Sequence, residues 1–519
     1  MTPKRVRTVE GSCWLCRDRR VLCDLQQPRC SRCVSKGEAC EYGEVRLRWC
    51  NGVAARGRYA GQNVPVSITP ARRNSRGSRG KTPSSKSENQ QGDDGEVPAV
   101  QTTFAPVDYN ALQVSGLSSH VTAEQLLLYF SNVVVDRFSL STDRVSINLP
   151  SVYEEPALRD SMSAVANAHH VLSLYPGGPG VGLAKERARW SAIHNFRTRL
   201  ECPSMESRVP GRDLFMANVL LCILDGVIDP HDESAATHMH YRGGRAILSQ
   251  WKKLQKQLCQ EKRGLPALML SVFATMDLTY SMLSGEEQYF QHTIWNSFAE
   301  SDGWWGVLPQ DDPFLEVLCT LSRLTRLGSL VSKGLVPSEE VLAEDVGTLL
   351  MALQSPPELL YDLSCLEGMG LDDKSISPLS LLFASPTDYL DRNQSWVVFC
   401  NAYRITGLIY AYRVFYQMSV GDPLVQHAVN LGIQAVCKTR LTGKLSHCLL
   451  FPALVIGSHC RSKEDQKAML VTIQSTAAFL HFGSLRVMES FLQRVWERDP
   501  VAETWWQFFE PIAKKAFIF

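Results

Sequence analysis

The chain has 519 residues, of which 45% are hydrophobic and 21% are charged, and its formal net charge is +1. This length is enough for a small module and a large body with its own core. Apolar runs stay short of the ~18 residues of a membrane span, and the charged N-terminus lacks the apolar core of a secretory signal. A membrane is therefore not an expected partner.

The near-neutral total hides an uneven distribution of charge. Residues 1–90 contain 19 Lys and Arg against 7 Asp and Glu, whereas residues 91–519 contain 35 against 46. A basic head on an acidic body suits a head that binds a polyphosphate. Because the basic residues adjoin a cysteine cluster, we interpret the head as a nucleic-acid-binding module and not as a solvated tail.

Six cysteines near the N-terminus form two copies of the spacing Cys-x2-Cys-x6-Cys: Cys13, Cys16, Cys23, Cys30, Cys33 and Cys40. Thiolates separated by two residues can share one tetrahedral Zn(II) ion. Six thiolates cannot give two ions four private ligands each, so two of them would bridge. A disulfide framework, or one four-cysteine site with two spare thiols, would leave the duplication unexplained. The sequence therefore predicts two zinc ions in one shared cluster.

This segment, with Pro28 in the loop between the two halves, resembles the fungal binuclear zinc cluster family of transcription factors. The resemblance implies that the first and fourth cysteines, Cys13 and Cys30, bridge the metals. We expect residues 17–22 to form a short helix whose ends are fixed by thiolates and metal. In the family such a helix enters the major groove and reads a CGG triplet.

The resemblance assigns the base contacts to Arg19 and Arg20, whose planar side chains can each donate two hydrogen bonds to guanine. Leu22 departs from the family, which usually has a basic residue there, and Asp18 adds a negative charge near the phosphates. Both changes are expected to weaken non-specific affinity. Contacts to DNA phosphates, which position the module without specifying sequence, are predicted for Arg5, Arg7, Arg17, Arg29, Arg32, Lys36, Arg46 and Arg48.

The predicted organisation is a basic arm over residues 1–12, the zinc cluster domain over 13–42, a linker over 43–118 and a large domain over 119–519. The linker is rich in Gly, Ser, Pro and Arg and is predicted to be disordered. It contains no heptad pattern for a coiled coil. The protein would then bind a single triplet or form a homodimer through its large domain.

The large domain is predicted to be all-α. Apolar residues recur with helical spacing over 123–138, 213–228, 237–251, 265–283, 314–331, 396–418, 424–438 and 483–496. Segments 240–248 and 451–458 resemble parts of the regulatory domain that follows the cluster in one subgroup of the family. The aromatic segment 505–519 is expected to dock onto the core and not to serve as an activation segment.

No catalytic motif was found. The glycine-rich segment 176–182 lacks the Gly-Lys-Ser/Thr ending of a phosphate-binding loop, and neither a nucleophile elbow nor a His-Glu-x-x-His motif occurs. The sequence thus predicts a non-enzymatic, nuclear transcription regulator that binds zinc, double-stranded DNA and transcription machinery or co-regulators. The alternatives are an interaction or scaffold protein whose head no longer binds specific DNA, and a catalytic protein with a DNA-targeting head.

Overall fold

The computed structural model describes residues 12–13, 15–16, 19, 21–26, 29–37, 40, 122–141, 144–174, 182–201, 211–230, 235–335, 339–354, 391–498 and 503–519. The chain divides into two compact units, Met1–Leu117 and Ser118–Phe519. Residues 1–11 of the predicted arm and the whole predicted linker lie outside the described residues. Disorder of the linker therefore stays a prediction.

Both units are helical where they are described, which confirms the predicted all-α class. No strand occurs in these parts of the chain, and an isolated bridge pairs Gly303 with Gly306. The smaller unit contains α2 (Ser31–Ser35). The first half of the larger unit contains α4 (Ala123–Tyr129), η1 (Phe130–Val134), α5 (Val135–Phe138), α6 (Leu149–Glu154), α7 (Pro156–Leu174), α8 (Gly182–Glu201), α9 (Arg212–Ile223), η2 (Leu224–Ile228), α10 (Ala235–Gln250) and α11 (Leu254–Gln260).

The second half of the larger unit continues the helical array. Its elements are α12 (Leu265–Ser284), η3 (His292–Phe298), α13 (Pro313–Ser332), α14 (Glu339–Gln354), α16 (Arg392–Val414), α17 (Pro423–Ile433), η6 (Gln434–Lys438), η7 (Gly443–His447), α18 (Leu450–Ser458), α19 (Lys463–Leu480), α20 (Ser484–Glu497) and α21 (Trp505–Ala513).

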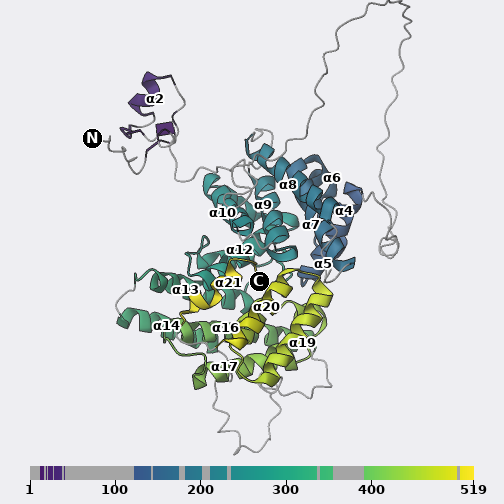
Figure 1. Ribbon diagram of the computed structural model, residues 1–519, viewed down its shortest axis with the longest axis vertical. Coiled ribbons are helices and arrows are strands. Elements are labelled where there is room, and N and C mark those ends of the chain that lie inside the picture. The colour runs from purple at the N-terminus through teal and green to yellow at the C-terminus, as the bar shows by residue number, and fades with distance from the viewer. Residues whose placement is uncertain are drawn as a thin grey trace, which may run out of the picture. The chain divides into compact units, whose positions relative to one another are not determined.

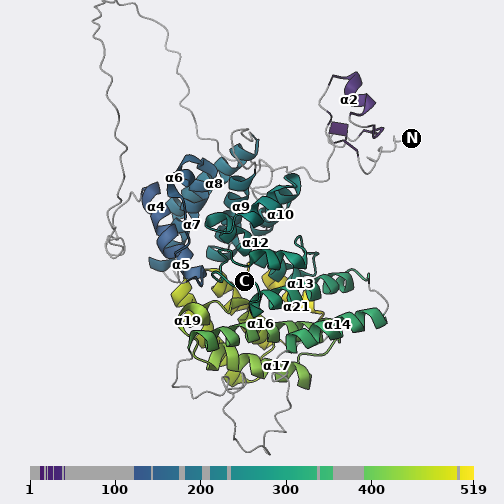
Figure 2. The ribbon, with the colours of Figure 1, turned by 180° about the vertical axis from the view of Figure 1, so that it is seen from behind.

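Within this unit, α4–α10 gather at one end and α13–α20 at the other, as seen from both sides in Figure 1 and Figure 2. Helix α12 lies between the two groups. It contacts α9 in the first group, α13 in the second, and α21 near the C-terminus. The unit is therefore one helical body organised around α12.

Several helices begin with side chains that complete the backbone hydrogen bonds of their first turn. In α4, α16 and α21 a capping box pairs Thr122 with Gln125, Asp391 with Gln394, and Thr504 with Gln507. In each pair the first side chain accepts from the backbone N–H of the second residue, and the second side chain accepts from the N–H of the first. These helix starts are thus encoded locally in the sequence.

Helix α12 forms the centre of the core and is buried along nearly its whole length. Its carboxylate, Asp277, accepts hydrogen bonds from Tyr241 Oη (2.6 Å) and from the backbone N–H groups of Tyr289 (2.9 Å) and Phe290 (3.1 Å).

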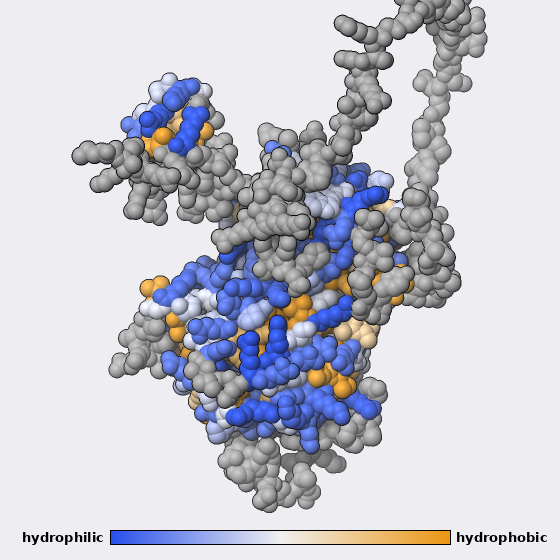
Figure 3. Space-filling model, viewed as in Figure 1, coloured by the Kyte–Doolittle hydropathy of each residue, from blue (hydrophilic) through white to orange (hydrophobic). Residues whose placement is uncertain are grey.

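By length and composition α12 is the one helix in the described residues that could cross a membrane, but 94% of its apolar window is buried inside this unit. Hydrophilic side chains cover most of the face seen in Figure 3.

The aromatic C-terminal segment docks onto this core, as predicted. Trp505, Phe508 and Phe517 are buried. Trp505 Nε1 donates a hydrogen bond to the carbonyl of Met282 in α12 (2.8 Å), and the Phe517 N–H donates to the carbonyl of Gly226 in η2 (2.9 Å). The segment therefore joins the central helix to the end of α9.

Four predicted helices differ in detail from those observed. Segments 123–138, 213–228 and 424–438 are helical but contain the π-helical stretches η1, η2 and η6. The predicted helix over 396–418 ends earlier, at Val414, because the chain turns at Gln417, whose φ is +51°. Arg413 donates a hydrogen bond to the Met418 carbonyl and closes that turn.

Two histidines of this unit, His169 in α7 and His459 at the end of α18, are buried. Burial lowers the pKa of His169 to about 4 and that of His459 to about 3. His169 Nε2 donates to the Leu480 carbonyl (2.9 Å), which leaves Nδ1 to accept from Tyr129 Oη (3.0 Å). Protonation of Nδ1 would remove that acceptor. Both rings are therefore neutral in the folded protein.

Acidification should destabilise the larger unit. An unfolded histidine titrates near pH 6.5, so below that pH the unfolded chain binds more protons than the folded chain, and stability falls as the pH drops toward 4. Chemical unfolding followed by circular dichroism at pH 7.5 and 5.0 should show a lower midpoint at pH 5.0. His169→Gln should reduce this pH dependence, whereas the same change at the exposed His194 should leave it intact. Equal midpoints at the two pH values would contradict the assignment.

Candidate metal centre

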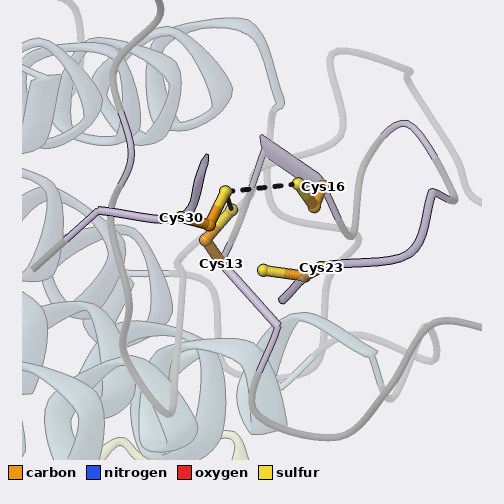
Figure 4. Close-up of side chains that lie close together, drawn as sticks. All are labelled: Cys13, Cys16, Cys23 and Cys30. Atoms are coloured by element: carbon orange, nitrogen blue, oxygen red, sulfur yellow. Dashed lines mark hydrogen bonds between the residues drawn. The ribbon is translucent and has the colours of Figure 1, made fainter. Parts of the chain in front are cut away.

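The sulfur atoms of the six predicted ligand cysteines converge. Cys13 Sγ lies 3.7 Å from Cys30 Sγ and from Cys33 Sγ, and Cys16 Sγ lies 3.8 Å from Cys30 Sγ. All six side chains are buried. Figure 4 shows Cys13, Cys16, Cys23 and Cys30 reaching toward one another from different parts of the segment. Residues up to 27 positions apart thus form one compact sulfur cluster.

The cluster consists of two overlapping groups of four cysteines. The first is Cys13, Cys16, Cys23 and Cys30, and the second is Cys13, Cys30, Cys33 and Cys40; within each, the sulfurs lie within 4.8 Å of one another. A tetrahedral zinc with Zn–S bonds of about 2.3 Å requires sulfurs about 3.8 Å apart. The measured spacings fit that requirement. Cys13 and Cys30, the two members common to both groups, are the positions at which the resemblance implies bridging.

Backbone N–H groups point at the sulfurs and favour their anionic form. Cys30 precedes α2, and its sulfur accepts a hydrogen bond from the Cys33 N–H (3.4 Å). The Cys30 N–H in turn donates to Cys40 Sγ (3.2 Å). Such donors stabilise a thiolate and orient it toward a metal.

The pKa values of the cysteine thiols indicate how readily each sulfur of the cluster loses its proton. Burial alone would raise the pKa of Cys30, but hydrogen bonds from the Cys33 N–H and from neighbouring thiols lower it to about 6. Burial raises the pKa of Cys33 to about 12 and also raises that of Cys13. Crowded sulfurs therefore cannot all lose their protons without a compensating cation. A divalent metal supplies that positive charge.

Apolar packing and hydrogen bonds add to the cysteine cluster in the described part of the head. Leu15 and Val21 pack against the cysteines. The carboxylate of Asp24 accepts a hydrogen bond from the Ser31 N–H (3.0 Å), and this contact joins the two halves of the module. The spacing of residues in the sequence did not identify Asp24 as a residue that joins the two halves. Because a module this small has no further apolar core among its described residues, metal ligation must provide most of its stability.

The predicted helix over 17–22 needs correction. Leu15 and Cys16 are helical, and the Arg19 N–H donates to the Leu15 carbonyl (3.1 Å), but Val21 and Leu22 are not helical. The Val21 N–H bonds to the Cys16 carbonyl (3.0 Å), one residue wider than an α-helical turn. Arg17, Asp18 and Arg20 lie outside the described residues, so the correction concerns the end of the predicted helix: Val21 and Leu22 are not part of it, and the chain continues to Cys23 in the cluster.

The predicted DNA-contacting residues are described only in part. Those in the described residues are all exposed, as DNA contacts require: Arg19, Arg29, Arg32 and Lys36. The others lie outside the described residues: Arg5, Arg7, Arg17, Arg20, Arg46 and Arg48. One guanidinium nitrogen of Arg32 donates to the Leu22 carbonyl (3.3 Å), so Arg32 also has a role within the module.

Comparison with known families agrees with this geometry. Residues 11–49 match the fungal Zn(2)-Cys(6) binuclear cluster domain, and residues 125–519 match the fungal specific transcription factor domain. The second match covers more than half of the chain. The protein therefore belongs to the fungal-specific transcription factor family and carries a zinc-binding Zn(2)-Cys(6) head.

One curated relative is arginine metabolism regulation protein II of Saccharomyces cerevisiae. It is 44% identical to this chain over 45 residues, which are 9% of this chain and 5% of the relative. The likeness therefore covers a small part of either protein. No solved structure matches the chain.

Replacing Cys30 with Ser should remove most of the bound zinc, because this sulfur belongs to both four-cysteine groups. Zinc per chain can be measured by elemental analysis after desalting of the full chain. The matched control is Cys222→Ser, which changes a buried cysteine of α9 in the larger unit and should leave the zinc content unaltered. Full zinc occupancy in Cys30→Ser would contradict the shared arrangement.

Proposed function

We propose that this protein is a sequence-specific transcription regulator that reads CGG-like triplets in the major groove of double-stranded DNA. The single observation that carries the proposal is the pair of four-cysteine groups that share Cys13 and Cys30 within a strongly basic head. We further propose that it acts in the nucleus on genes transcribed by RNA polymerase II. A metabolic or secondary-metabolite gene cluster is the proposed kind of target.

The head would hold two zinc ions, with Cys13 and Cys30 as bridging ligands. Bound zinc supplies fixed tetrahedral anchors and positive charge, which replace the core that the module lacks. Cys16 and Cys23 would complete one ion's ligands, and Cys33 and Cys40 the other's. The exposed basic residues then project from a rigid support.

Base reading is assigned to Arg19 and Arg20. A guanidinium that donates two hydrogen bonds to guanine O6 and N7 discriminates against other bases by about 1–3 kcal/mol. The remaining basic residues of the head would contact phosphates and set the register of the module on the duplex. Under this division, Arg19 and Arg20 would determine which sequence is bound, and the remaining basic residues would determine the overall affinity for DNA.

The larger helical unit is the proposed regulatory body. It carries no catalytic motif in its sequence, and its family membership supports a role in transcription. We propose that it contacts transcription machinery or co-regulators and that it provides any homodimer interface. The printed name of the Saccharomyces cerevisiae relative refers to regulation of arginine metabolism, which supports a metabolic target.

A second candidate is an interaction or scaffold protein whose head no longer binds specific DNA. Leu22 and Asp18 favour it, because they reduce the positive charge beside the residues assigned to base reading. Fluorescence anisotropy separates the two candidates: the full chain is titrated with CGG-containing and scrambled duplexes at near-physiological salt, with and without a zinc chelator. A preference for CGG that the chelator removes supports the regulator. Equal, salt-sensitive binding to both duplexes supports the second candidate.

Arg20→Ala should reduce the preference for CGG over scrambled DNA roughly tenfold or more, because one bidentate contact is lost. The zinc content should not change, since Arg20 is not a ligand. The measurement is the ratio of the two dissociation constants, with elemental analysis on the same sample. An unchanged ratio would refute the assignment of Arg20 to base reading.

Lys36→Ala, unlike Arg20→Ala, should weaken DNA binding without changing the preference for CGG. Lys36 is an exposed residue at the end of α2, where a contact to a phosphate is predicted. Its loss should weaken binding to both duplexes by the same factor and reduce the slope of log affinity against log salt by about 0.9. A change in the CGG preference without a change in this slope would exclude the phosphate role.

A further inference from the structure

Leu22 places a large apolar side chain on the surface of the basic head. Its side chain is 57% exposed. The preceding residue, Val21, packs against the cysteine cluster. The two neighbours therefore face different ways, and Leu22 faces away from the cluster.

The backbone around Leu22 is held from two sides. Arg32 Nη1 donates a hydrogen bond to the Leu22 carbonyl (3.3 Å), and the next residue, Cys23, is buried in the sulfur cluster. One residue further on, Asp24 binds the Ser31 N–H. Since this backbone is already ordered, a contact made by Leu22 would cost little additional conformational entropy.

Leu22 also lies close in sequence to the residues assigned to base reading. It follows Arg19, which is exposed, by three positions and Arg20 by two. Three residues span at most about 10 Å, which is about three base-pair steps. A side chain at this position therefore lies within the length of about three base-pair steps of the residues assigned to base reading.

The chemistry of the side chain selects its target. Thymine presents a C5 methyl group in the major groove, which apolar side chains contact, whereas the other edges present hydrogen-bonding groups that leucine cannot use. A basic residue at this position would bind a phosphate and be indifferent to sequence. We propose that Leu22 is a specificity-determining residue that contacts the methyl group of a thymine flanking the triplet. This inference rests on the proposed function and extends the recognised sequence beyond CGG.

The test removes one methyl group from the DNA. Zinc-loaded full chain is titrated with duplexes that contain one CGG triplet and a thymine at a defined flanking position, and with the same duplexes containing deoxyuridine in place of that thymine. At one flanking position the wild-type protein should bind the deoxyuridine duplex roughly fourfold more weakly, the factor expected for burial of one methyl group. Leu22→Ala should bind the two duplexes equally.

Val34 supplies the matched control, because it is also 57% exposed but lies on α2. Val34→Ala should keep the wild-type sensitivity to the methyl group, and zinc content should show that both variants retain the cluster. The inference would be overturned if the wild-type protein still prefers CGG but binds the thymine and deoxyuridine duplexes equally at every flanking position. Sensitivity that persists in Leu22→Ala would overturn it as well. Loss of all preference for CGG would instead refute the proposed function, and this inference with it.

Discussion

The convergence of six sulfur atoms into two overlapping four-cysteine groups is the constraint on which the described part of the head depends. Cys13 and Cys30 each belong to both four-cysteine groups, so the two halves of the segment cannot separate without breaking both sites. The halves are otherwise joined by exposed hydrogen bonds such as that from the Ser31 N–H to Asp24. Exposed contacts of this kind contribute little to stability. The positions of the described basic side chains of the head, Arg19, Arg29, Arg32 and Lys36, therefore depend on metal ligation.

The larger unit obtains its stability in a different way. It surrounds α12 with apolar side chains and satisfies the buried carboxylate of Asp277 with donors from α10 and the loop after α12. The C-terminal segment then bonds to the Met282 and Gly226 carbonyls and connects elements far apart in sequence. The groups of side chains that could hold a metal ion among the described residues all lie in the head, so the packing around α12 is built from apolar contacts and hydrogen bonds.

Sequence patterns predicted the parts of this structure that depend on local chemistry. Ligand spacing identified the cysteines that the structure brings together, and apolar periodicity identified α12 nearly to its ends. Helix α8 is not among the segments with a clear apolar stripe, because it buries charge: Arg189 lies 3.1 Å from Asp225 and 3.0 Å from Asp229. An apolar pattern cannot reveal ion pairs with a later helix. The π-helical stretch η2 was missed for a similar reason, since its Gly226 and Ile228 carbonyls accept from Phe517 and Gly483, more than 250 residues away.

The same distinction explains why the residues predicted to contact DNA bases were harder to place than the predicted metal ligands. The predicted ligands could be identified from residue type alone, because only the cysteine sulfurs can occupy the centre of the cluster. The helix expected over 17–22 depended on the path between ligands, and that path is set by Val21 turning inward and Cys23 reaching the sulfurs. Val21 packs against the cluster, and the next residue, Leu22, is exposed. The departure from a basic residue at this position therefore alters an exposed surface of the head and leaves the cysteine cluster unchanged.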